Sequence, residues 1–166
     1  GVRSMPDDML NIIEGMYAQR GQAPCTLDLA ALASMEPAPW AWASVTGEGE
    51  LVAELASAPA LPGQSWSAVL RVATPTHPQL GNGVLMRMVC PMQADAATLN
   101  RAEAEEWTAC NQIGAWFNES DDQSLTTFVT FLPNAMVEEG LVQNLIFHAR
   151  GRVVWVKDRL QALTKS

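Results

Sequence analysis

The sequence contains few of the residues that build disulfide frameworks, metal sites and proton-transfer sites. Among its 166 residues only three are cysteines, Cys25, Cys90 and Cys110, and only two are histidines, His77 and His148. The cysteines are odd in number and widely spaced, so we expect neither a disulfide framework nor a zinc cluster. Their sparse use favours a reducing compartment, and we expect a cytoplasmic protein.

Basic residues are also scarce, with 10 Lys and Arg against 18 Asp and Glu and a formal net charge of −8. Sequence-independent binding of nucleic acid needs a basic surface that follows the phosphates, so we expect no nucleic-acid partner. Half of the basic residues lie between Arg150 and Lys165. One explanation is that these cations lie at the negative end of a final helix. The alternative explanation is a basic patch that binds an acidic partner.

Long apolar runs are missing as well. No stretch approaches the roughly 18 apolar residues of a membrane span, and the N-terminus has no basic start followed by an apolar signal segment. We therefore expect no membrane partner. The chain begins at Gly1 rather than at a methionine, which suggests a processed or excised fragment.

Apolar residues are plentiful, at 48% of the chain against 17% charged residues. That balance supports a folded core and is unlike that of a disordered chain. The length fits one domain, with a helical N-terminal segment over residues 1–36 and a sheet with helices over residues 37–163.

Helical periodicity predicts helices at both ends of the chain and in between. Residues 5–19 form an amphipathic helix, residues 27–35 a weaker helical or irregular stretch, and residues 94–110 a helix capped by Asp95 or Thr98. A long final helix over residues 135–163 is capped by Asn134 and has a possible kink or break near Gly151. In the middle helix, the acidic side chains are expected to face solvent: Glu103, Glu105 and Glu106.

Alternating and β-rich runs predict three pairs of strands. Residues 40–46 and 51–57 form a hairpin around a Gly-Glu-Gly-Glu turn, and residues 65–74 and 84–92 form a second pair. Between the second pair, Gly81-Asn82-Gly83 reads as a tight turn. The third hairpin lies within residues 112–134, and both faces of its second strand, 125–132, are apolar, as in a central or doubly covered strand. The chain is thus α+β, an antiparallel sheet with helices packed on it.

Candidate catalytic and metal-binding residues are few. We expect His77 and His148 to have surface or capping roles, because no spacing brings them beside acids or a thiol, and a nucleophilic pair of Cys110 and His148 has no other support. The acidic hairpin turn lacks the spacing of a calcium loop and reads as a solvated turn. Its acids are Glu119, Asp121 and Asp122. We predict no metal, no cofactor and no catalytic residue.

Tryptophan and methionine are abundant, with six and eight residues. Both side chains are adaptable contact residues that are favoured at protein interfaces, although core packing is the ordinary alternative. Large exposed apolar patches generally mark interaction sites. We predict a partner-binding surface that contains Trp40 or Trp42 with Met86 or Met88.

Two short segments give a family resemblance: Glu106-Trp107-Thr108-Ala109-Cys110-Asn111 and Val137-Glu138-Glu139-Gly140-Leu141. With the order of elements around them, they resemble the YbjN family of bacterial proteins, whose fold is similar to that of type III secretion chaperones. The resemblance spans roughly residues 65–163, whereas the N-terminal helix and the hairpin at 40–57 have no counterpart. The resemblance implies a helix-and-sheet sandwich that binds protein segments or has a regulatory role. It identifies no catalytic residue in this chain.

These observations favour a non-enzymatic, chaperone-like or regulatory module that binds a polypeptide partner through a sheet face or edge strand and forms a homodimer. The competing hypothesis is a small-molecule-binding or enzymatic domain. Its pocket would lie between the sheet and the final helix, lined by Trp107, Trp116 and His148.

Overall fold

The computed structural model describes residues 7–55, 67–106 and 114–164. Its helices are α1 (Asp7–Gln22), α2 (Leu29–Ala33), α3 (Ala96–Glu106), the 3-10 turn η2 (Asn134–Met136) and α4 (Glu139–Thr164). Its strands are β1 (Trp40–Val45), β2 (Leu51–Leu55), β3 (Ala68–Ala73), β4 (Thr76–His77), β5 (Gly81–Cys90), β6 (Ala115–Asn118) and β7 (Thr126–Pro133).

The strands form one antiparallel sheet in the order β1-β2-β3-β5-β7-β6, with β4 paired to β5 outside this path. The predicted fold class, α+β with helices packed on an antiparallel sheet, is confirmed. β7 lies between β5 and β6, which confirms that the doubly apolar strand is an interior strand. The strand pairs 40–46 with 51–57, 65–74 with 84–92, and 113–117 with 125–132 are also found among the described residues. The predicted strand ends at 56–57, 65–66 and 113 lie outside the described residues.

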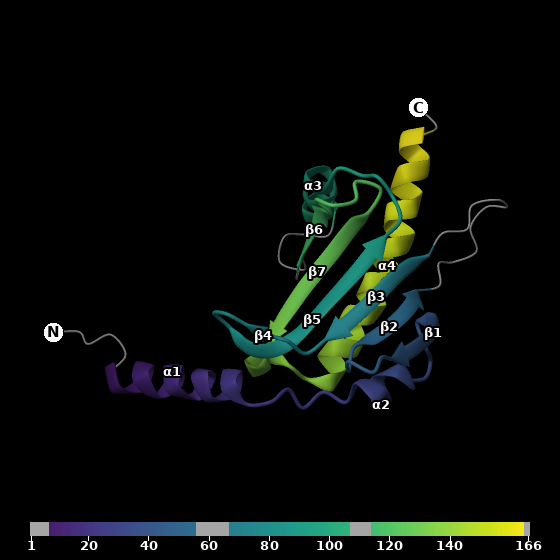
Figure 1. Cartoon of the computed structure of the whole chain (residues 1–166). Helices are drawn as coiled ribbons and strands as arrows, with labels where there is room; N and C mark the ends of the chain where they lie inside the picture. The colour runs from purple at the N-terminus through teal and green to yellow at the C-terminus, as the bar shows by residue number, and fades with distance from the viewer. Residues whose placement is uncertain (1–6, 56–66, 107–113, 165–166) are drawn as a thin grey trace.

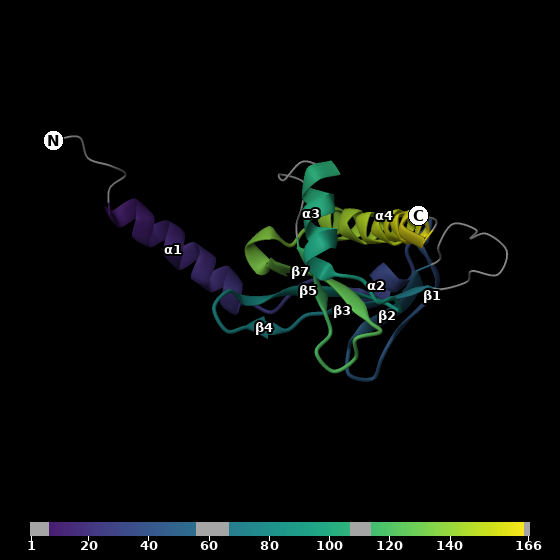
Figure 2. The ribbon, with the colours of Figure 1, turned by 90° about the horizontal axis from the view of Figure 1, so that it is seen from above.

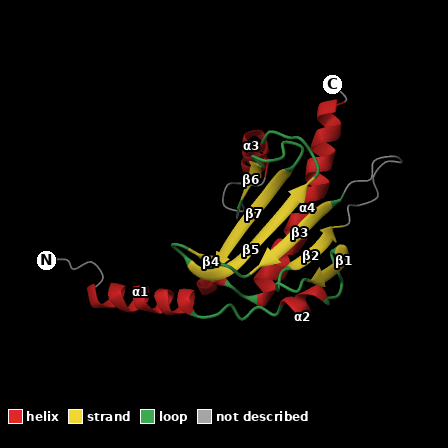
Figure 3. Ribbon diagram, viewed as in Figure 1, coloured by secondary structure: helices red, strands yellow, loops and turns green. Residues whose placement is uncertain are grey.

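The long helix α4 crosses one face of the sheet diagonally (Figures 1 and 3). Seen from above, α3 lies on the same side of the sheet as α4 (Figure 2). We call this side the inner face and the opposite side the outer face. Strand side chains alternate between the two faces, so β2 buries Leu51, Ala53 and Leu55 on the inner face while Val52 and Glu54 lie on the outer face.

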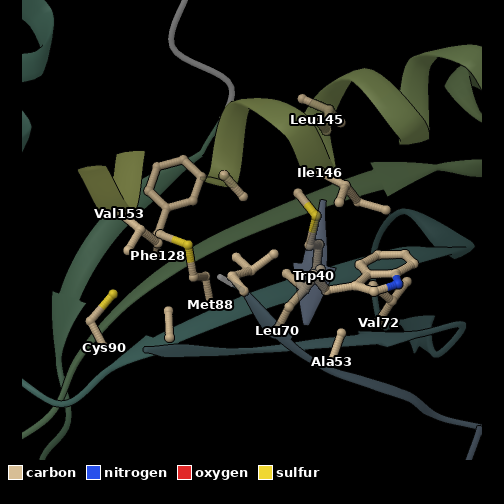
Figure 4. Close-up of a cluster of buried hydrophobic side chains, with 14 of the residues drawn as sticks. Trp40, Ala53, Leu70, Val72, Met88, Cys90, Phe128, Leu145, Ile146 and Val153 are labelled. Atoms are coloured by element: carbon tan, nitrogen blue, oxygen red, sulfur yellow. The ribbon is translucent and has the colours of Figure 1, made fainter. Parts of the chain in front are cut away.

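The core lies between the inner face and α4. Sheet residues such as Leu70, Met88 and Phe128 contribute one side of it, and the apolar stripe of α4 contributes the other (Figure 4). The buried apolar residues of α4 are Val142, Leu145, Ile146, Ala149, Val153 and Val156. Their spacing of three or four residues is that of one helix face.

The start of the last helix differs from the prediction. Asn134 begins the short turn η2 instead of capping α4, which starts five residues later at Glu139. Its side chain is used elsewhere, because Asn134 Nδ2 donates a hydrogen bond to the Ala23 carbonyl oxygen at 2.6 Å. α4 continues through Gly151 without a break. Gly151 is exposed, while its neighbours Arg152 and Val153 are buried against the sheet and hold the helix in place.

The predicted tight turn at residues 81–83 is wrong. The turn lies at residues 78–80, and Gly81, Asn82 and Gly83 belong to β5, where they pair with β4 and β7. Gly83 is required by close packing, because a Cβ atom there would lie 2.6 Å from the Phe131 ring and 3.0 Å from Pro133 Cα. The glycines therefore allow close strand approach.

The neighbours Ile146 and Phe147 on α4 provide a test of this packing. Ile146 is fully buried, whereas Phe147 is 39% exposed. Ile146→Ala should lower the free energy of unfolding by about 3 kcal/mol, because it leaves a cavity under the sheet. Phe147→Ala should change it by less than about 1 kcal/mol. Urea unfolding followed by circular dichroism measures both, and equal losses would contradict this placement of α4.

Candidate functional site

The predicted partner-binding residues do not share one exposed surface. Trp40 is 7% exposed, Met86 4% and Met88 1%, so the expectation of exposure is wrong for these three. The two methionines lie on inner-face positions of β5 beneath α4. Trp42 is the exposed member, at 47%.

Trp40 and Trp42 are separated because β1 is irregular between them. Trp40 pairs with the buried Leu55, whereas Trp42 pairs with the adjacent residue Glu54, so the register shifts by one position. Such a bulge reverses the face on which the following side chains lie. Trp42 therefore lies on the outer face, where its Nε1 donates a hydrogen bond of 2.8 Å to Glu54 Oε2.

The two described residues of the predicted pocket, Trp116 and His148, do not converge. Trp116 is buried in the core and His148 is exposed on α4, away from the stripe that contacts the sheet. Trp107 and Cys110 lie outside the described residues. The structure therefore does not test whether Cys110 and His148 form a pair.

The two edge strands of the sheet, β6 and β1, differ in whether their outer backbone groups have hydrogen-bond partners. At β6 the side chain of Asn100 on α3 pairs with the backbone of Trp116: Nδ2 donates to the Trp116 carbonyl oxygen at 3.0 Å, and Oδ1 accepts from the Trp116 amide at 2.8 Å. The side-chain amide of Asn100 therefore satisfies the backbone groups of this edge in the way that a neighbouring strand would. At β1, no backbone hydrogen bond from the described residues arrives from any element other than β2.

The composition of β1 is unusual for a free edge. Its six residues, WAWASV, include neither a charged residue nor a proline, the features with which proteins commonly protect edges. Trp42 is 47% exposed and Val45 is 39% exposed, and the intervening side chains are small. The bulge next to Trp42 interrupts the edge, and α2 packs against β1. β1 is therefore an apolar edge with free backbone groups.

The outer face beside this edge is mostly apolar. Two arginines, Arg71 and Arg87, lie directly opposite each other in adjacent strands. Arg71 forms an ion pair with Glu50 at 2.8 Å and Arg87 one with Glu119 at 3.6 Å, which offsets the repulsion between the guanidinium groups. The half-buried apolar residues around them are Val52, Val69, Leu85, Val89, Val129 and Phe131. An open antiparallel face is usually polar, whereas this one is mostly apolar. It is therefore also suited to contact with a partner.

A cleft of about 870 Å³ lies at the C-terminal end of α1. It is bordered by the turn between β4 and β5, whose tip carries Leu80, and by Met136 of η2. His77 holds this turn, because its Nδ1 accepts hydrogen bonds from the amides of Gln79 and Leu80, each at 3.1 Å. The capping role predicted for His77 is confirmed. The full lining is Gly21, Gln22, Thr76, His77, Pro78, Gln79, Leu80, Gly81, Asn82, Pro133 and Met136.

Sequence reasoning missed a buried ion pair between α3 and α4. Glu103 is 1% exposed, so its predicted solvent position is wrong. Its Oε1 accepts a hydrogen bond of 2.6 Å from Arg152 Nε, and its Oε2 accepts one of 2.8 Å from Trp116 Nε1. The Arg152 guanidinium lies 4.1 Å from the centre of the Phe128 ring. The signal in the sequence is the helical spacing of Ala96, Leu99 and Glu103, which places all three on one face.

The acidic turn has structural partners instead of a metal arrangement. Glu119 accepts a hydrogen bond of 2.8 Å from Thr127 Oγ1 and pairs with Arg87. Hydrogen bonds from the side chain and amide of Ser124 lower the pKa of Asp122. No group of three or more His, Cys, Asp or Glu side chains is placed to hold a metal ion in residues 7–55, 67–106 and 114–164.

Comparison with family models, curated proteins and solved structures finds no match to this chain. No helix in the described part of the chain is both long enough and apolar enough to cross a membrane.

The buried ion pair can be tested by double substitution. Arg152→Met should lower the free energy of unfolding by about 3 kcal/mol or more, because it leaves the Glu103 carboxylate buried without its cation. Adding Glu103→Gln should restore part of this loss, since the amide oxygen still accepts the Trp116 hydrogen bond without a charge. Chemical denaturation of both single variants and the double variant measures the coupling.

The control is Glu106→Gln, at the exposed carboxylate that accepts a 2.7 Å hydrogen bond from Trp155 Nε1. This change should cost less than about 1 kcal/mol. Strictly additive losses at positions 103 and 152 would contradict the coupling.

Cys90 provides a second test, because burial raises the pKa of its thiol to about 12. The thiolate is the reactive species, so below that pH the native Cys90 should react with iodoacetamide slowly. In a Cys110→Ser variant at pH 8, its labelling in the native protein should be at least roughly a thousandfold slower than in the unfolded protein. Peptide mass spectrometry separates it from the half-buried Cys25, and rapid native labelling would contradict the burial.

Proposed function

We propose that this protein is a non-enzymatic module that binds an extended segment of another polypeptide by adding it to the sheet at β1. The observation that supports the proposal is the free apolar edge of β1 with Trp42 exposed beside it. Strand addition gains its affinity from main-chain hydrogen bonds and its specificity from alternate side chains. β1 offers both a row of free backbone groups and an exposed aromatic ring.

The shape of the edge indicates the kind of segment. On the outer face, the added strand passes beside Trp42 and Ser44, and on the inner face it passes beside Ala43 and Val45. The small residues leave room for larger side chains from the partner. The proposed partner is therefore an extended segment with apolar side chains at alternate positions and few charges.

The YbjN-like relationship is part of the same proposal. In support of it, α3, the β6–β7 hairpin and α4 follow one another as the resemblance implies. Of the first resembling segment, only Glu106 at the end of α3 lies within the described residues, and the second segment spans the start of α4. We infer a chaperone-like or regulatory role in the cytoplasm, where the partly buried Cys25 and the buried Cys90 stay reduced.

A peptide library tests the proposal without knowledge of the natural partner. Random twelve-residue peptides are selected on the immobilised protein, and the best binders are titrated into isotope-labelled protein. The expected result is an apolar alternating consensus whose binding shifts the backbone amide signals of residues 40–45. Trp42→Lys should weaken binding on the order of tenfold or more, because it places a charge at the edge.

The matched control is Phe147→Lys, which places the same charge at an exposed apolar position on α4. This variant should bind the selected peptides as the unmodified protein does. Failure to select any peptide, or binding that leaves the amides of residues 40–45 unchanged, would overturn the proposal.

A further inference from the structure

The two faces of the sheet differ in what covers them. Helices α3 and α4 lie over the inner face, whereas no helix of the described residues lies over the outer face (Figure 2). Domains are normally built from two packed layers, because an apolar sheet face has to be buried against a second layer of secondary structure. The outer face is mostly apolar, so it is suited to a layer that another protein supplies.

Strand pairing arranges the outer-face side chains in three rows across the sheet. The rows are Glu54-Val69-Val89-Thr127, Val52-Arg71-Arg87-Val129 and Ala73-Leu85-Phe131. The two arginines occupy the centre of the middle row. The first and third rows place apolar side chains on both sides of them, so the face consists of two apolar bands with a cationic pair between them.

Each of the two arginines is neutralised from a hairpin turn. Glu50, at the end of the β1–β2 turn, pairs with Arg71, and Glu119, at the start of the β6–β7 turn, pairs with Arg87. The stem of an arginine side chain is apolar, and its guanidinium group is more weakly hydrated than an ammonium group. The centre of the outer face can therefore be covered by apolar side chains of a partner.

The two hairpin turns carry further acids that are not neutralised. Both turns lie on the side of the sheet opposite α3 and α4 (Figure 2). Their acids Glu48, Asp121 and Asp122 are exposed, and none of the three forms an ion pair within the described part of the chain. Two free acidic corners therefore border the apolar face.

The outer side as a whole is negatively charged. Six acids and two arginines leave it with a net charge of −4; the acids are Glu48, Glu50, Glu54, Glu119, Asp121 and Asp122. The described strands and their turns contain no other Lys or Arg, because the remaining basic residues of the described chain are in α1, α3 and α4. This charge favours a basic partner over an acidic one.

We propose that the outer face binds a basic amphipathic helix of another protein. The apolar stripe of the helix contacts the two apolar bands, and Lys or Arg side chains near its two ends pair with the acidic turns. A helix fits better than an extended segment, because the middle of a sheet face offers no free backbone groups. A segment on that face must satisfy its own backbone hydrogen bonds, as a helix does.

The positions of the acidic turns indicate the length of this helix. They lie at diagonally opposite corners of the outer face, one between β1 and β2 and the other between β6 and β7. Four strand spacings of about 4.8 Å and three row spacings of about 6.8 Å give a diagonal of about 28 Å. A helix of about 18 residues covers that distance at about 1.5 Å per residue.

A synthetic peptide of this length provides the test. It has leucines at helical spacing along one side and lysines near both ends, and calorimetry measures its dissociation constant for the full chain. We expect a dissociation constant on the order of 10 µM. In isotope-labelled protein, the peptide should shift the backbone amide signals of residues 69–73 and 85–89 and leave those of α4 unchanged.

Two altered peptides separate the apolar contact from the charge contact. A peptide with glutamates in place of the lysines should bind at least about tenfold more weakly, because it meets acidic turns with acidic side chains. A peptide with serines in place of the leucines should lose binding, since it removes the apolar stripe.

Charge reversal on the protein tests the same contact at exposed positions, where folding is unaffected. The double variant Glu48→Lys/Asp121→Lys should weaken binding of the lysine peptide on the order of tenfold or more. The matched control is Glu105→Lys/Asp158→Lys, which changes the net charge by the same amount at exposed positions of α3 and α4. The control should bind the lysine peptide as the unmodified protein does at about 0.15 M salt, where distant charges are screened.

Four results would each overturn the proposal. They are no binding of the lysine peptide at about 1 mM, binding that leaves the amides of residues 69–73 and 85–89 unchanged, equal affinity for the lysine and glutamate peptides, and equal losses in the variant and its control.

This inference goes beyond the proposed function, because it concerns the outer face and not the β1 edge. The variant Glu48→Lys/Asp121→Lys should still bind the extended peptides selected on β1, which shift the amides of residues 40–45. The helical peptide shifts a different set of amides, so each proposal can fail while the other stands.

Discussion

The ion pair between Glu103 and Arg152 connects the two long helices on the inner face and determines how the last hairpin is held. Glu103 also accepts the Trp116 indole hydrogen, and the Arg152 guanidinium lies over Phe128. Four elements, α3, β6, β7 and α4, therefore meet at one pair of charges that are almost fully buried. A buried pair is costly to desolvate and contributes little net stability, so its physical value lies in the single arrangement that satisfies all of its groups.

That arrangement has a consequence for the rest of the sheet. With α3 and α4 fixed on the inner face and α2 packed against β1 and β2, no helix among the described residues is left to cover the outer face. α1 is anchored at residues 22–23 and extends away from the sheet. Apart from the outer face, the apolar surfaces that remain are at the two ends of the molecule: Trp42 and Val45 at one, and α1 with its cleft at the other.

The sequence predicts the elements of this fold well because their signals are local. Alternation in β2 and the apolar stripe of α4 follow directly from strand and helix periodicity. Glu103 was misplaced because a periodic pattern treats every acid as solvent-exposed, and its partner Arg152 is 49 residues away. The separation of Trp40 and Trp42 onto different faces cannot be read from strict alternation, because the bulge between them depends on pairing with β2. The cleft joins segments as distant as Gly21 and Met136, so no local pattern could identify it.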